Sequence, residues 1–123
     1  MKANPRSVAV PVTFATTTCE AARLALDELL GKGMRGSASA LHAASYELRG
    51  RLILEIWPIL ETAGFEQDAE DLADDAILAV LEGRVRAPRI PGEALAAVMR
   101  HARQLAEDHI EETRERWGIR DDQ

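Results

Sequence analysis

Hydrophobic residues recur with the period of an α-helix between Glu66 and Glu82. They are spaced at intervals of three and four residues, which places them on one side of a helix. The positions are Ala69, Leu72, Ala73, Ala76, Ile77, Val80 and Leu81. Asp68 stands where its carboxylate would cap the first turn, and Gly83 supplies the stop. The pattern predicts a helix over residues 66–82 with one face in a core.

The opposite face of this predicted helix is acidic. Residues 66–82 hold seven carboxylates and no lysine or arginine. Four of the carboxylates face away from the hydrophobic stripe near its start: Glu70, Asp71, Asp74 and Asp75. Like charges three or four residues apart destabilise a helix by about 0.2–0.5 kcal/mol per pair. Two interpretations follow, a solvated face on an acidic protein or a docking surface for a basic partner helix.

The same spacing predicts three further helices. The first covers residues 17–30 and ends at Gly31, the second covers about 40–62, and the last covers about 93–117. Pro58 lies inside the second pattern, and its missing backbone hydrogen bond predicts a kink or a break there. We therefore expect an all-α fold, a small bundle of about four helices.

Residues 1–16 depart from the helical pattern. Four hydrophobic residues alternate with smaller ones, as in a β-strand: Val8, Val10, Val12 and Phe14. Pro11 restricts such a strand to the edge of a sheet. A single strand in a helical protein has no partner of its own. We expect a flexible N-terminal extension, or a segment that becomes ordered against a partner or a second copy.

Composition supports a helical protein and narrows its class. Hydrophobic residues make up 46% of the 123 residues but aromatic ones only 4%, and the net charge is −6. The negative charge argues against a non-specific binder of nucleic acid or membrane surfaces. Cys19 is the only cysteine and no apolar run would span a bilayer, so we expect a cytoplasmic protein. The predicted organisation is an extension over residues 1–37, carrying one short helix, and a helical domain over 38–123.

The loop after the acidic helix is basic. It carries Arg84, Arg86 and Arg89 without an acidic residue, and its two prolines keep it extended. Arginines on a short exposed loop suit contacts with phosphate groups. The alternative is a linker whose arginines pair with nearby carboxylates.

Residues for catalysis or metal binding do not cluster in the sequence. His101 and His109 are eight residues apart on one predicted helix, too far to share a metal ion without a ligand from elsewhere. The carboxylates lie on predicted surfaces, and no nucleophile motif is present. We expect a protein that is not an enzyme and holds no metal or cofactor.

Two blocks of the sequence resemble region two of the bacterial sigma factors of the extracytoplasmic-function group. Residues 68–77 read DAEDLADDAI and residues 102–110 read ARQLAEDHI, and the likeness covers about residues 46–116. Three features depart from the family pattern. Asp74 replaces a usual Gln, Ala97 replaces a common Trp, and residues 111–115 include acidic residues where the family is arginine-rich.

The resemblance implies a partner for each charged surface. It implies that four carboxylates dock on the clamp helices of the largest subunit of core RNA polymerase: Glu70, Asp71, Asp74 and Asp75. Contact with the minus-ten element of promoter DNA would fall to Arg84, Arg86, Arg89, Arg100, Arg103 and Gln104. Two alternatives stay open. One is a sigma mimic that binds an anti-sigma factor, and the other is a helical interaction module or homodimer without a role in transcription.

Overall fold

Four α-helices make up the described part of the chain, as the sequence predicts. The computed structural model describes the backbone of residues 3–118 and the side chains of residues 19–118. The helices are α1 (Ala3–Met34), α2 (Ala38–Ala63), α3 (Ala69–Leu81) and α4 (Ala94–Arg116), and a 3₁₀ turn, η1 (Glu66–Asp68), precedes α3. The all-α expectation is confirmed. Among the described residues, no helix is long and apolar enough to cross a membrane.

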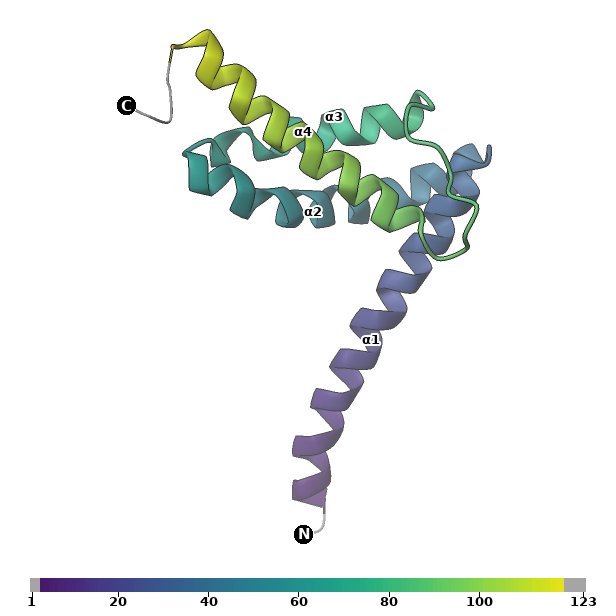
Figure 1. Ribbon diagram of the computed structural model, residues 1–123. Coiled ribbons are helices and arrows are strands. Elements are labelled where there is room, and N and C mark those ends of the chain that lie inside the picture. The colour runs from purple at the N-terminus through teal and green to yellow at the C-terminus, as the bar shows by residue number, and fades with distance from the viewer. Residues whose placement is uncertain (1–2, 119–123) are drawn as a thin grey trace.

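The second half of α1 packs with α2, α3 and α4 around one core, whereas the first half of α1 extends away from the bundle (Figure 1). Leu26 and Leu30 lie in this core, although both belong to the range 1–37 that the sequence analysis assigned to the extension. The core is built mainly of leucine and alanine. The small alanine side chains allow the helices to approach closely. The core's largest fully buried side chains are Leu26, Leu30, Leu48, Leu52, Ile56, Leu60 and Val98.

Helix α1 is longer than the predicted helix over residues 17–30. Gly31 does not end it; the chain leaves the helix after Met34, and Gly36 takes the left-handed conformation with φ +118°. The alternating segment of residues 8–14 is also part of α1 rather than a strand. Alternation over so few residues is compatible with either conformation when no neighbouring strand is available to pair with it.

Helix α2 begins and ends at clear local signals. The Ser37 hydroxyl accepts a hydrogen bond from the Ala40 amide at 3.2 Å, and Gly64 closes the helix with φ +85°. The break considered at Pro58 does not occur, since the helix continues to Ala63. Ile56 and Leu60 are fully buried on either side of Pro58 and hold the chain in helical register.

The start of α3 differs from the expected capping, and the start of α4 is capped by a residue far away in the sequence. The Asp68 carboxylate does not cap α3 but lies 2.8 Å from Nε2 of His109 on α4. The first turn of α4 is capped from a distance, because Oδ1 of Asp27 on α1 accepts the amide hydrogen of Leu95 at 2.8 Å. Both contacts join segments far apart in the sequence and fix how α4 lies on the bundle.

Candidate functional site

The acidic face of α3 is divided by an arginine from α2. Nε of Arg49 lies 2.7 Å from Oδ1 of Asp74, and Nη2 of the same side chain lies 3.1 Å from Oε1 of Glu70. Asp74 and then Glu70 raise the pKa of Arg49 above its usual range, since both favour the charged guanidinium. One flank of the acidic face is therefore neutralised in part by the chain itself.

The outer flank of the same face stays free. Asp71 and Asp75 are exposed and form no ion pair with any residue in the described part of the chain. The spacing of a helix places Leu78 one turn beyond Asp75 on this side. Unpaired carboxylates are thus followed by an exposed aliphatic side chain.

Two leucines interrupt the acidic surface at the end of α3. Leu78 is 46% exposed and Leu81 is 60% exposed. The sequence pattern placed Leu81 in the core, and this prediction is wrong, because Ala79 occupies the buried position instead. We call the exposed set of Asp71, Asp75, Leu78 and Leu81 the α3 outer face.

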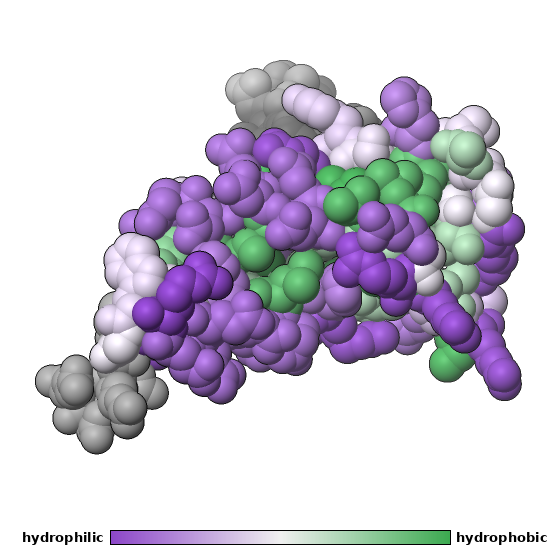
Figure 2. Space-filling view, turned by 90° about the horizontal axis from the view of Figure 1, so that it is seen from above, coloured by the Kyte–Doolittle hydropathy of each residue, from purple (hydrophilic) through white to green (hydrophobic). Residues whose placement is uncertain are grey.

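A hollow lies beside this face, between the start of α2 and the end of α3. It has a volume of about 410 Å³ and is lined by apolar side chains that include Leu41, Ile77 and Leu81. The space-filling view from above, the side on which α3 and α4 lie in Figure 1, shows hydrophobic patches within a mainly hydrophilic surface (Figure 2). Such patches rimmed by polar groups are typical of protein interaction sites.

The six residues predicted to contact DNA fall into two groups. Three residues have partners within the chain. Arg84 pairs with Glu82 at 2.7 Å, Arg103 pairs with Glu55 at 2.5 Å, and the Gln104 amide donates to Asp108 at 2.9 Å.

The second group consists of Arg86, Arg89 and Arg100. All three are exposed, and none forms an ion pair with a residue that the structure describes. Arg35 donates a hydrogen bond to the carbonyl oxygen of Pro88 at 3.4 Å, so the arginine loop lies close to the end of α1. Three of the six residues predicted to contact DNA therefore have no ion pair or side-chain hydrogen bond within the described part of the chain.

Arg49, Leu78 and the Asp27 cap were missed by sequence reasoning. Each depends on which helices lie side by side, and the spacing within one helix carries no such information.

The chain matches no protein-family model, no curated protein and no solved structure.

Proposed function

We propose that the α3 outer face docks on a basic helical partner, and that this partner is the pair of clamp helices of the largest subunit of core RNA polymerase. The negative charge and the exposed leucines of the α3 outer face indicate a basic helix as the class of partner. The identity of the partner is taken from the resemblance to sigma region two. The observation that carries the proposal is the placement of the exposed Leu78 one turn beyond the unpaired carboxylate of Asp75, with the exposed Leu81 one turn further along α3.

Leu78 and Leu81 are three residues apart and both exposed, so together they form a small apolar patch on this face. Burying apolar surface stabilises a complex by about 25 cal/mol per Å², so covering Leu78 and Leu81 would contribute to affinity. The neighbouring carboxylates would attract a positively charged helix and fix its register. The hollow beside Leu81 has room for an aliphatic side chain of the partner.

Arg49 reduces the negative charge of this region without cancelling it. Glu70, Asp71, Asp74 and Asp75 carry four negative charges against one positive charge, which leaves three. The pairs with Glu70 and Asp74 are largely exposed to solvent, and exposed ion pairs contribute little stability. Lysine or arginine side chains of a partner can therefore replace Arg49 at small cost.

The test is a charge reversal on the outer face. Asp71→Arg combined with Asp75→Arg is expected to abolish capture of core RNA polymerase, and capture by the unaltered chain should weaken as salt rises. The matched control is Glu111→Arg combined with Glu115→Arg, which makes the same charge change at exposed positions of α4. Equal capture by both double variants would overturn the proposal.

A second function is favoured by the internal pairing of Arg84, Arg103 and Gln104. A sigma mimic that binds an anti-sigma factor has no need of DNA contacts, and it can leave these side chains engaged within the chain. If the chain captured an anti-sigma factor but supported no promoter-dependent transcription, its function would be that of a sigma mimic. Transcription that is lost on changing Arg86 and Arg89 to alanine would assign promoter contact instead.

A further inference from the structure

The first half of α1 has a sequence unlike that of the bundle. Residues 7–19 contain no charged residue and include Val8, Val10, Val12 and Phe14. In Figure 1 this half of the helix extends away from α2, α3 and α4. Isolated helices of about 12–15 residues are only marginally stable in water, so packing against another surface would stabilise this one.

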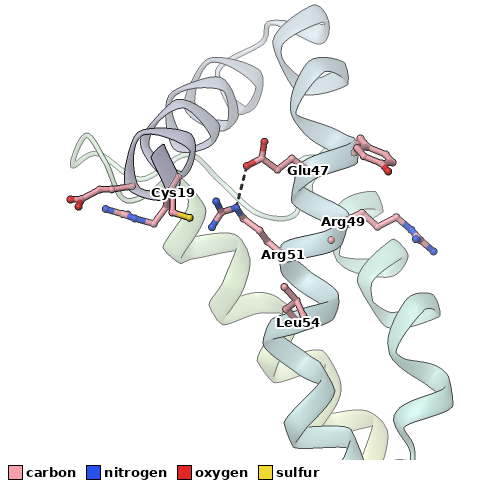
Figure 3. Close-up of a pocket in the computed structure, with 9 residues that line it drawn as sticks. Cys19, Glu47, Arg49, Arg51 and Leu54 are labelled. Atoms are coloured by element: carbon pink, nitrogen blue, oxygen red, sulfur yellow. Dashed lines mark hydrogen bonds and ion pairs between the residues drawn. The ribbon is translucent and has the colours of Figure 1, made fainter. Parts of the chain in front are cut away.

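A groove opens where the projecting half of α1 leaves the bundle (Figure 3). It has a volume of about 860 Å³ and lies between Cys19 and Arg23 of α1 and the outer side of α2. Tyr46 and Leu54 of α2 line it and are 92% and 75% exposed. Glu47 and Arg51 lie beside them and pair with each other at 3.3 Å, so these two side chains add no net charge to the groove. The other charged residues of the lining are Glu20, Arg23 and Arg49.

Gly50 lies in the same groove, in the middle of α2. A methyl group added there would meet no atom within 4 Å, so packing inside the chain does not require glycine at this position. Glycine inside a helix costs about 0.5–1 kcal/mol relative to alanine. An unobstructed glycine between two exposed large side chains leaves room for the close approach of another helix.

We propose that this protein forms a symmetric dimer in which the projecting half of α1 from each copy lies in the α1–α2 groove of the other. An uncharged, valine-rich helix suits a groove whose exposed Tyr46 and Leu54 are bordered by a paired Glu47 and Arg51. The segment cannot fill the groove of its own chain, because α1 continues unbroken through Cys19 and leads away from it. A second copy presents the same segment and the same groove in reciprocal positions.

The proposed contact would run along the projecting half of α1. Residues 3–18 form a helix about 24 Å long at 1.5 Å per residue. Each copy contributes one segment and one groove, so the dimer has two equivalent contacts. For comparison, a standard protein–protein interface covers about 800 Å² per partner. The surface used does not include the α3 outer face, and the dimer is therefore independent of the proposed function.

The effect of salt separates the two interactions. Each copy carries a net charge of −6, so charge opposes dimer formation, and the apolar contacts must provide the affinity. Added salt screens this repulsion and is expected to strengthen the dimer. The same salt is expected to weaken docking through the carboxylates of α3.

The first test is light scattering of the full chain over a range of concentrations. We expect the mass to rise to that of a dimer, and we expect Val12→Glu and Leu54→Arg each to keep the chain monomeric. The control is Ile90→Arg, which changes an equally apolar side chain, 66% exposed, on the loop before α4 and leaves the dimer intact. Circular dichroism of each variant verifies that the bundle is folded.

The decisive test mixes the two monomeric variants. In a mixed dimer the segment altered by Val12→Glu would enter the groove altered by Leu54→Arg, while the second contact joins an unaltered segment to an unaltered groove. Mixing is therefore expected to restore the dimer, and a segment that merely paired with its twin would not be rescued. A chain that stays monomeric at every concentration overturns the proposal, as does a mixture without dimers or a monomer that binds lipid vesicles instead.

The single cysteine supplies a second measurement. Cys19 is exposed in the isolated chain and lines the groove. Its reaction with a bulky maleimide is expected to slow as the concentration of the unaltered chain rises, and to stay constant for Leu54→Arg. Equal slowing in both proteins would place the dimer contact elsewhere and overturn the proposal.

Discussion

Asp27 in α1 holds the first turn of α4 by accepting a hydrogen bond from the amide of Leu95 at 2.8 Å. Asp27 is buried, and Glu93, which directly precedes the helix, provides no side-chain cap. The start of α4 thus depends on a residue 68 positions earlier in the sequence. The negative charge also lies at the helix end where the dipole is positive, which is the favourable arrangement.

Removal of this cap should destabilise the fold. Asp27→Ala is expected to lower the free energy of unfolding by about 1–2 kcal/mol, the usual loss for an N-cap. Asp27→Asn keeps an acceptor oxygen and should lose less. Urea titrations followed by circular dichroism measure both, with Glu28→Ala as the exposed control that changes stability by less than about 0.5 kcal/mol. An Asp27→Ala protein as stable as the unaltered chain would contradict the capping role.

Two glycines should respond to alanine in opposite directions. A Cβ at Gly33 would lie 2.9 Å from Cβ and 3.0 Å from Cα of Leu41, so Gly33→Ala forces α1 and α2 apart and should cost about 1–3 kcal/mol. Gly50 has no atom within 4 Å of that position, so Gly50→Ala should stabilise the folded chain by about 0.5–1 kcal/mol. Thermal unfolding at low protein concentration compares them directly. If both substitutions raised the stability, or both lowered it, the space available for a methyl group would not be what determines their effect.

Arg49 is expected to compete with any basic partner of α3. Replacing it by methionine keeps the aliphatic stem and frees the carboxylates of Glu70 and Asp74. Affinity for a peptide that carries the basic clamp-helix sequence should then rise about two- to fivefold at low salt, since exposed ion pairs are weak. Fluorescence anisotropy over a salt series measures this rise, which should vanish at high salt. Arg51→Met, which removes a pair on the other side of α2, is the control.

His109 should stabilise the start of α3 through two contacts. Its Nε2 lies 2.8 Å from Oδ2 of Asp68, and its ring meets Phe65 edge to face with centroids 5.9 Å apart. His109→Ala should therefore cost about 1–3 kcal/mol, the sum of an aromatic contact and a hydrogen bond. A double-mutant cycle with Asp68→Ala isolates the hydrogen bond as a coupling of about 0.5–1.5 kcal/mol. A coupling of zero would show that the two side chains act separately.

Local patterns were sufficient to predict α2, α3 and α4. The stripe of Leu48, Leu52, Ile56 and Leu60 marks the buried side of α2, and the alanine-rich stripe marks that of α3. Leu81 was misplaced because it lies in the last turn, where α3 reaches the edge of the bundle and the core no longer covers the stripe. Periodicity gives the direction of a side chain but not the extent of the neighbouring helices.

Long-range contacts could not be predicted in the same way. The acidic face was visible in the sequence, whereas its division by Arg49 requires the packing of α2 against α3. The pairing of Arg103 with Glu55 likewise depends on α4 lying against α2. In the N-terminal region the alternation of valines was compatible with a strand or a helix, and no local signal before residue 17 decided between them.

The close contact between Gly33 and Leu41 has a mechanical consequence. It lies near one end of α1, and the opposite end is about 45 Å away, at 1.5 Å per residue. A rotation of only about 10° about this pivot would displace the far end of the helix by about 8 Å, from the same rise per residue. The absence of a side chain at Gly33 therefore affects the direction in which the far end of α1 projects from the bundle.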